Sequence, residues 1–165
     1  MQKIILLVGF SGSGKDYLVN AFHLKPVISH TDRQQRNNEL NGYSKHFHDV
    51  GFFGFSVDQK KVIAHTVING CNYWTTKEDL IGKDVYVIDV NGVFYMKYFY
   101  KEKFYDKFDI IILEINHCKR FFRLMKRGIK TNQIKKSFIR FFSDFKTFKH
   151  IKKIKKLKNC TIIKL

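Results

Sequence analysis

Several residue types and patterns are scarce in this chain of 165 residues. It has one proline, Pro26, and three widely spaced cysteines, Cys71, Cys118 and Cys160, which form neither a zinc-binding nor a disulfide pattern. The longest apolar runs are about one strand long, far below the roughly 20 residues of a membrane-spanning helix. The N-terminal run is also too short for a signal peptide. These absences predict a cytoplasmic protein with no membrane partner.

Acidic residues are also scarce, and the imbalance is uneven along the chain. Against 31 Lys and Arg there are 14 Asp and Glu, for a net charge of +17. Residues 1–100 carry 11 basic and 9 acidic side chains, whereas residues 101–165 carry 20 and 5. Such a basic half predicts contact with phosphates, either of nucleotides or, as the less favoured partner, of a nucleic acid. The alternative is a solvated lysine-rich surface.

The chain is rich in apolar residues. Hydrophobic residues make up 44% of it, including 17 Phe. A chain of this length and composition can bury its own core, so we expect one folded domain over residues 1–165.

One motif dominates the N-terminal region. The apolar run Ile4–Val8 is typical of a strand buried on both faces. It leads into Gly-Phe-Ser-Gly-Ser-Gly-Lys-Asp and then a helix whose expected apolar stripe is Leu18, Val19 and Phe22. In that context a G-x-x-x-x-G-K sequence predicts a phosphate loop, whose backbone N–H groups and helix N-terminus bind polyphosphate. The residues expected to bind ATP here are Ser11, Gly12, Ser13, Gly14, Lys15 and Asp16. Lys15 would contact the β- and γ-phosphates.

Two carboxylates are candidate ligands of Mg²⁺ accompanying ATP. Asp16 stands where the common loop has Ser or Thr, and its oxygen can bind this hard cation directly or through water. Asp89 ends the apolar strand Val85–Val90, on the ligand side of a parallel sheet. The alternatives are a favourable first-turn acid for Asp16 and a strand-end capping acid for Asp89.

Arginines in a polar loop provide a second phosphate site. Arg33 and Arg36 are three residues apart in a stretch with few apolar neighbours. Paired guanidinium groups in such a loop suit a phosphate dianion, which each can bind bidentately.

The remaining pattern predicts a core and a small lobe. We expect a short strand at Lys25–Thr31, core strands at Asp109–Ile115 and Cys160–Ile163, and, between them, short strands over 47–76 with a helical stretch around Val57–Ala64. His46-x-His48 offers two imidazoles on one strand face, but no third ligand follows at metal spacing, so the sequence favours no metal site there.

Two helices are expected between the last two core strands. The first begins at Asn116, has Cys118, Phe121, Phe122 and Met125 as its apolar face, and ends at Gly128. The second begins near Thr131, and its apolar stripe indicates core or lobe packing: Ile134, Phe138, Phe141, Phe145 and Phe148.

Together these residues resemble the guanylate kinase family of nucleoside monophosphate kinases, from Ile4 to about residue 142. The more specific match is Ser29-x-Thr31-x-Arg33-x-x-Arg36-x-x-Glu39-x-Asn41-Gly42 ending in Phe47, which is similar to the family's acceptor-binding stretch. Three further segments follow in family order: Tyr73-x-Thr75, Asp89-Val90-Asn91-Gly92-Val93, and Arg123-Leu124-x-x-Arg127-Gly128.

The resemblance implies a P-loop three-layer α/β/α sandwich with a parallel sheet, a small acceptor-binding lobe over about 33–81, and a lid over about 126–142. The core would comprise about 1–32 and 82–165. The implied activity is transfer of the γ-phosphoryl group of ATP, with Mg²⁺, to GMP or dGMP. The implied acceptor-binding residues are Ser29, Arg33, Arg36, Glu39, Lys45, Tyr73 and Thr75, with Arg123, Arg127 and Arg140 (or Lys136) closing over the ATP phosphates.

Some positions depart from the family. The two carboxylates that bind guanine in the family align with Ala64 and Val87. The family's pocket tyrosine aligns with Lys45, with Tyr43 as the alternative in its place. Losing buried acceptors removes polar discrimination between bases. The Gly-Lys-Asp ending of the loop is similar to viral-type deoxynucleoside monophosphate kinases, so another deoxynucleotide is an alternative acceptor. A non-catalytic binding module of the same fold is the other alternative.

Overall fold

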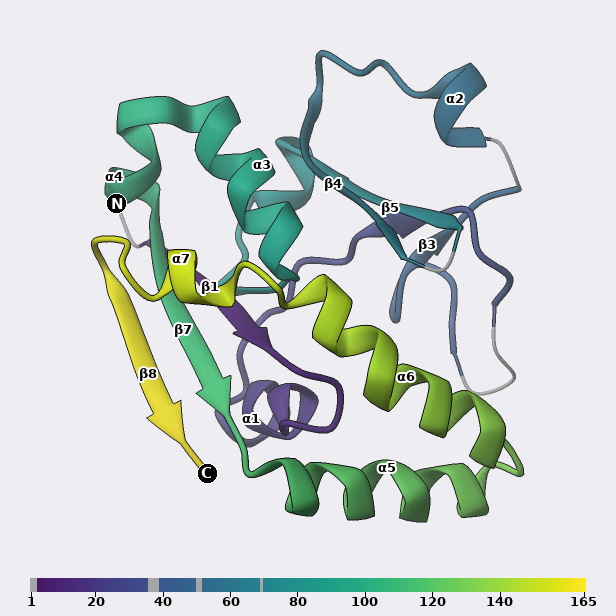
Figure 1. The fold of residues 1–165 in the computed structure, drawn as a ribbon. Helices are drawn as coiled ribbons and strands as arrows, with labels where there is room; N and C mark the ends of the chain where they lie inside the picture. The colour runs from purple at the N-terminus through teal and green to yellow at the C-terminus, as the bar shows by residue number, and fades with distance from the viewer. Residues whose placement is uncertain (1–2, 36–38, 50–51, 69) are drawn as a thin grey trace.

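The computed structural model describes residues 3–35, 39–49, 52–68 and 70–165. Its core is a four-stranded parallel sheet in the order β6-β1-β7-β8 (Figure 1). The strands are β1 Ile4–Gly9, β6 Val85–Val87, β7 Phe108–Glu114 and β8 Cys160–Lys164. All four core strands expected from apolar runs are confirmed, although β6 ends earlier than predicted because Asp89 already caps the next helix.

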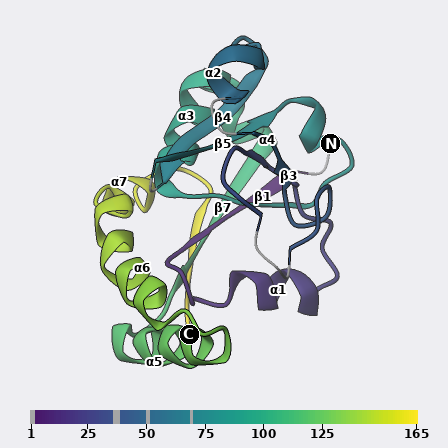
Figure 2. The ribbon, with the colours of Figure 1, turned by 90° about the vertical axis from the view of Figure 1, so that its right-hand side faces the viewer.

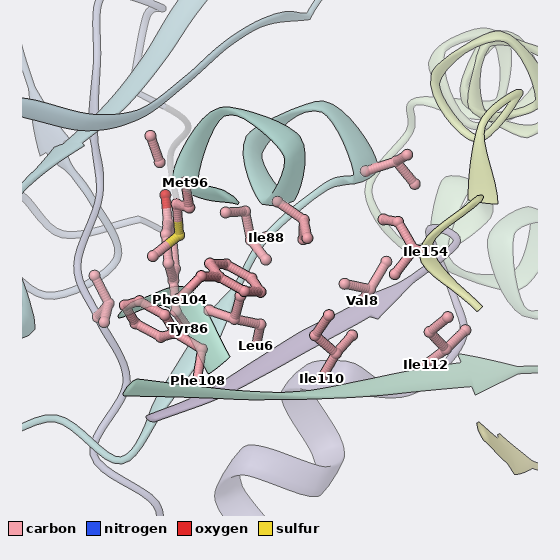
Figure 3. Close-up of a cluster of buried hydrophobic side chains, with 14 of the residues drawn as sticks. Leu6, Val8, Tyr86, Ile88, Met96, Phe104, Phe108, Ile110, Ile112 and Ile154 are labelled. Atoms are coloured by element: carbon pink, nitrogen blue, oxygen red, sulfur yellow. The ribbon is translucent and has the colours of Figure 1, made fainter. Parts of the chain in front are cut away.

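Side chains alternate between the two faces of this sheet, as the pleat requires. Leu6 and Val8 of β1 and Ile110 and Ile112 of β7 lie on one face, under α3 (Val90–Tyr100), with α4 (Phe104–Lys107) and α7 (Ile151–Ile154) (Figure 3). On the other face Leu7 and Leu113 pack with Val19 of α1 (Lys15–Ala21). The predicted three-layer α/β/α arrangement is therefore confirmed.

The lobe is a second, mixed sheet in the order β3-β2-β5-β4. Its strands are β2 His30–Thr31, β3 His46–Phe47, β4 Val62–Ile68 and β5 Cys71–Thr76. The expected strand at Lys25–Thr31 is divided: Pro26 bridges to Val85 in the core, and only β2 joins the lobe.

The helical stretch expected around Val57–Ala64 is wrong. The lobe's helix is α2, Phe52–Ser56, and residues 62–68 form β4, which pairs antiparallel with β5. Val62 and Ile63 are β-branched and fully buried, and cross-strand packing outweighs the short helical periodicity at this position.

The helices α5 (His117–Lys130) and α6 (Ile134–Thr147) form a hairpin at the same end of the core as α1 (Figures 1 and 2). The predicted start is confirmed, since the Asn116 side chain accepts a hydrogen bond from the Cys118 N–H. The predicted end at Gly128 is wrong. A Cβ there would lie 2.7 Å from Ser137 Oγ and 3.1 Å from the Ile134 Cα, so this glycine permits close approach of α6.

The expected apolar faces of these helices are partly wrong. The buried residues of α5 are Arg120, Leu124 and Gly128, whereas Cys118 is exposed and Phe122 is 71% exposed. On the α6 stripe only Phe148, its C-cap, is buried, and Phe138 and Phe145 remain 48% and 43% exposed. The difference arises because the face of α5 that packs on the phosphate loop and α6 is the one carrying Arg120, Leu124 and Gly128.

Two short 3₁₀ helices complete the architecture: η1, Glu78–Leu80, and η2, Lys101–Lys103. Among the described residues, no helix is long and apolar enough to cross a membrane.

Candidate active site

The loop after β1 contains two glycines in a left-handed backbone conformation. Gly12 and Gly14 have φ angles of +80° and +98°, in the left-handed region that glycine adopts without strain, and Gly14 precedes α1. Lys15 Nζ donates to the carbonyl oxygens of Gly9 (2.6 Å) and Phe10 (3.0 Å). Burial lowers the pKa of Lys15, and the nearby Arg120 and Arg127 lower it further, while the charges of Asp16 and Asp144 oppose that shift.

The floor of the loop is tightly packed. A Cβ on Gly9 would lie 2.7 Å from Ser13 Oγ and 3.0 Å from the Leu113 carbonyl oxygen, so only glycine fits. Ser13 is buried, and within the described part of the chain its Oγ has no hydrogen-bond partner. A buried polar atom without a partner is a site that a ligand can satisfy.

A carboxylate that sequence reasoning missed contacts the loop. The Ser11 backbone N–H and hydroxyl donate to Asp144 of α6, at 2.8 Å and 3.1 Å. Asp144 also lies 3.8 Å from the Arg120 guanidinium. The available signal was that Asp144 is the only acidic residue after Glu114 in a strongly basic segment.

Arg120 is the second residue that the sequence did not identify. Its side chain is fully buried, with the guanidinium carbon 4.6 Å, 4.2 Å and 5.0 Å from the ring centres of Phe10, Phe141 and Phe145. One nitrogen donates to the Phe141 carbonyl oxygen at 2.7 Å. Its charge therefore lies in an aromatic cage directly beside the phosphate loop.

The predicted arginines of α5 and α6 lie at different places. Arg123 donates to the Gly12 carbonyl oxygen at 3.4 Å, so it is next to the loop. Arg127 is exposed on α5, close enough for its charge to act on Lys15. Arg140 lies half-buried on α6, where Ser143 Oγ donates to its carbonyl oxygen.

Four of the predicted site residues meet at one small cavity. It has a volume of about 80 Å³ and lies between strand β6 of the core and strand β4 of the lobe. Ser29, Lys45, Tyr73 and Asp89 line it. Ala64 and Val87, the positions where the family carboxylates are missing, are in its wall as well.

Polar groups around this cavity lie within hydrogen-bond distance of one another. Thr75 Oγ1 is 2.7 Å from the Tyr86 hydroxyl, a lining group that the sequence did not single out. Burial raises the pKa of Tyr86 to about 12. Lys45 Nζ is 3.4 Å from Ser29 Oγ. Burial, followed by the nearby Arg33 charge, lowers the pKa of Lys45 to about 8.

The predicted acceptor residues Arg33 and Glu39 pair with each other. Two guanidinium nitrogens of Arg33 contact the two Glu39 oxygens at 2.7 Å and 2.6 Å, and the guanidinium also covers the Phe47 ring at 5.1 Å. Burial alone would lower the pKa of Arg33, but interactions with Glu39 and Tyr73 together more than offset this and raise it. Arg36 lies outside the described residues.

Both candidate Mg²⁺ ligands occupy helix starts. Asp89 Oδ1 accepts the Gly92 N–H at 2.7 Å as the N-cap of α3, and Oδ2 accepts from Thr66 at 2.8 Å, which confirms the capping role. Burial raises the pKa of Asp89 despite these bonds. Asp16 is exposed in the first turn of α1. Together they offer oxygen donors, the chemistry that Mg²⁺ prefers.

A second cavity of about 320 Å³ lies beside the phosphate loop. Its wall includes Phe10 of the loop, Asn116 and His117 after β7, and Lys164 at the end of β8. It is lined by polar and apolar groups at the carboxyl ends of the core strands, where open α/β sheets bind ligands.

The parallel sheet, its two helical layers and the loop at the end of β1 define a P-loop α/β protein. A guanylate kinase structure from Anaplasma phagocytophilum aligns with 98% of this chain and 76% of its own, with a TM-score of 0.61 and 19% identity. That likeness concerns the fold.

Sequence comparison identifies the family. Guanylate kinase of Clostridium tetani is 30% identical over 147 residues, covering 81% of this chain and 68% of the relative. Guanylate kinase of Psychrobacter arcticus is 30% identical over 137 residues, covering 76% and 64%. The present chain belongs to the guanylate kinase family, and it spans about two thirds of the length of these relatives. No family model matches it.

Proposed function

We propose that this protein is a nucleoside monophosphate kinase that transfers the γ-phosphoryl group of ATP to GMP or dGMP. The observation that carries the proposal is the pairing of two sites in one fold. A glycine loop with a half-buried lysine follows β1. A mostly apolar cavity, to which Ser29, Lys45 and Tyr73 contribute polar groups, lies between core and lobe. The two family members compared above are guanylate kinases by name.

In this proposal the donor phosphates bind the loop. Lys15, with N–H groups of the loop and of the start of α1, holds the β- and γ-phosphates, and Arg123 and Arg127 add positive charge from α5. Phosphoryl transfer needs charge neutralisation and in-line positioning and no protein nucleophile. Asp16 and Asp89 are the candidate ligands for Mg²⁺, which supplies further neutralisation of phosphate charge when bound.

The acceptor monophosphate binds Arg33, Arg36 and Tyr73. For this to happen the Arg33–Glu39 ion pair exchanges one partner, and Glu39 becomes free to accept from the nucleoside. An arginine held in a bidentate geometry by a carboxylate is already oriented for a phosphate, which offers the same pair of oxygens.

We infer from the cavity size that the lobe opens to admit the acceptor. A volume of about 80 Å³ is well below the roughly 300–1,000 Å³ of typical ligand sites. Opening of the lobe before acceptor entry, and closure afterwards, would exclude water from the transferring phosphoryl group.

In this proposal the base of the acceptor lies against a cavity wall without the two carboxylates of the family. Ala64 and Val87 cannot accept hydrogen bonds through their side chains, so Tyr86, Lys45 and Ser29 provide the polar contacts. We infer that the preference among purine monophosphates is weaker here than in a pocket with two carboxylates.

The cavity of about 320 Å³ is the candidate place for the donor base. It shares Phe10 with the phosphate loop, and Asn116 and Lys164 supply polar groups at its edge. ATP with its phosphates in the loop would direct its base to this side of the sheet.

The decisive test measures ADP formation from ATP and Mg²⁺ with a panel of ribo- and deoxynucleoside monophosphates, using the protein and Lys15→Ala in parallel. We expect turnover with GMP or dGMP and a loss of several orders of magnitude in Lys15→Ala. Turnover that survives in Lys15→Ala would contradict the assigned site.

The second candidate is a binding module built on the same fold. The observation that favours it is the apolar pair Ala64 and Val87 in the acceptor cavity. ADP formation and ligand binding together distinguish the two functions. A binding module would form no ADP with any acceptor, although its cavity would still bind a phosphorylated ligand. The kinase proposal requires both ATP binding and turnover.

A further inference from the structure

Three histidines and one aspartate gather in the lobe, outside the residues assigned to phosphoryl transfer. His30 on β2 stands directly opposite His46 on the parallel strand β3, and His48 follows two residues later. On the other side of His30, β5 runs into η1, which carries Asp79. Ligand atoms of His30, His46 and Asp79 all lie within 4.8 Å of one another.

The aspartate of this cluster is held in place. Asp79 Oδ2 accepts the Thr76 N–H at 2.7 Å and the Thr76 hydroxyl at 2.9 Å. Both of its oxygens lie 3.3 Å from His30 Nε2. A carboxylate oriented by its own chain costs little entropy when it takes a further ligand.

The ring of His30 is oriented by a partner on its other nitrogen. His30 Nδ1 and His48 Nε2 are 2.9 Å apart. Trp74 stacks on the His30 ring with centroids 5.5 Å apart and lies tilted against the His48 ring at 5.1 Å. Metal-binding histidines regularly use the second ring nitrogen for such a hydrogen bond, which selects the tautomer with a free lone pair at Nε2.

His46 lacks such a partner. Its ring stacks on that of His30 with centroids 4.6 Å apart, and across the described residues neither of its ring nitrogens makes a hydrogen bond. An imidazole beside a second imidazole and a carboxylate is therefore left with a lone pair to donate.

We propose that His30, His46 and Asp79 bind one divalent transition metal ion of the zinc class, with His48 as the residue that positions His30. Two imidazoles and one carboxylate are a donor set that zinc uses, with a fourth place for water. Donors around tetrahedral zinc lie about 3.3 Å apart. The ligand atoms here lie within 4.8 Å of one another, so metal binding requires the stacked His30 and His46 rings to rotate until their lone pairs converge on the ion. Mg²⁺ and Ca²⁺ prefer oxygen ligands only and are poor candidates.

A metal ion at this position would lie next to the acceptor cavity. His30 follows Ser29, and His46 follows Lys45, two residues that line the acceptor cavity. The bound ion links β2, β3 and η1, three elements that otherwise meet through one or two residues each. It would stabilise the lobe beside that cavity whether or not the protein transfers phosphate.

The test uses the full chain after treatment with a chelator. Isothermal titration with Zn²⁺ should give one ion per chain, and Zn²⁺ should raise the thermal unfolding midpoint, whereas Mg²⁺ should do neither. Co²⁺ should give a visible d–d spectrum without the near-ultraviolet charge-transfer band of a thiolate, since the candidate ligands include no cysteine. His46→Ala and Asp79→Asn should each lose this binding, and exposed His150→Ala should keep it.

A positioning role for His48 predicts a graded effect. His48→Ala should retain the one-to-one stoichiometry and weaken Zn²⁺ affinity by about 10–100-fold, whereas His46→Ala removes the site. If a variant does not fold, long-range ¹H–¹⁵N spectra of the wild-type histidines replace it, because Zn²⁺ should shift the ligating nitrogens of His30 and His46 specifically.

The proposal is overturned if the wild type does not bind Zn²⁺, if binding persists unchanged in both His46→Ala and Asp79→Asn, or if a thiolate band identifies a cysteine as ligand. The cluster would then be a hydrogen-bonded contact between His30 and Asp79 beside stacked rings. Neither result depends on phosphoryl transfer, because binding is measured directly.

Discussion

At the scale of single residues, Lys45 has the clearest pH signature. Its folded pKa of about 8 lies below the ordinary 10.5, because the side chain is buried and Arg33 is close. Below pH 8 the charge on Lys45 therefore opposes folding, since the unfolded chain holds the proton more tightly. That penalty fades as the pH rises from about 8 toward 10.

We predict that the free energy of unfolding of the wild type rises with pH relative to Lys45→Met over that window, by at most about 1.4 kcal/mol per pH unit. Urea unfolding at a series of pH values measures the difference. The comparison cancels the similar contribution of Lys15, whose pKa is also lowered. Parallel curves for the two proteins would show that Lys45 keeps an ordinary pKa.

At the scale of secondary-structure elements, Gly128 determines how closely α5 and α6 approach. Alanine favours a helix over glycine by about 1 kcal/mol, yet a Cβ here would contact Ser137 Oγ at 2.7 Å. We predict that Gly128→Ala destabilises the protein by about 1–3 kcal/mol through overpacking.

The matched control for that substitution is Gly54→Ala. Gly54 lies inside α2, and nothing lies within 4 Å of its added Cβ. It should be neutral or slightly stabilising in the same urea titration. Equal effects of the two substitutions would mean that α6 can move away from α5 without cost.

The ion pair between α5 and α6 gives a second element-scale prediction. Asp144→Ala leaves the fully buried Arg120 charge without its carboxylate and should cost about 3–5 kcal/mol. Arg120→Met keeps an apolar side chain among the three phenylalanines and should cost much less. The double variant should be more stable than the sum predicts, by about 0.5–3 kcal/mol in a double-mutant cycle. Additive effects would show that the 3.8 Å contact carries no coupling.

At the scale of the whole molecule, the net charge of +17 is concentrated in residues 101–165. Like charges destabilise the compact state, and salt screens them over about 8–10 Å at physiological strength. We predict that the thermal unfolding midpoint rises when salt increases from low concentration to about 0.3 M. Exposed Lys152 and Lys153 of α7 are suitable for the control, because Lys152→Gln/Lys153→Gln should reduce the salt effect. A midpoint that falls with salt would point instead to favourable surface ion pairs.

The same charge tests the nucleic-acid alternative. Binding of DNA or RNA through the basic half would weaken steeply and linearly on a logarithmic salt scale, since each phosphate contact releases counterions. A filter-binding or fluorescence titration at several salt concentrations measures that slope. Absent or salt-insensitive binding removes a nucleic acid as partner.

Much of the fold could be predicted because its signals are local. Apolar runs at residues 4–8, 85–90, 109–115 and 160–163 each contain a core strand, and the glycine loop lies between β1 and α1 as expected. The start of α5 at Asn116 was also predicted correctly from the sequence. The short helix predicted over 57–64 was wrong, because pairing with β5 overrides periodicity in so brief a segment.

The sequence alone therefore predicts the phosphate loop, the parallel core and the family, because each of these depends on residues that are close together in the chain. Only the tertiary structure decides the rest. Asp144 meets Ser11 across 133 positions, and His30 meets Asp79 across 49. The role of Gly128 in the close approach of α5 and α6 depends on the position of α6 in the folded chain. The physical reason is that pKa values, metal sites and close packing depend on distances between segments, which neither composition nor periodicity encodes.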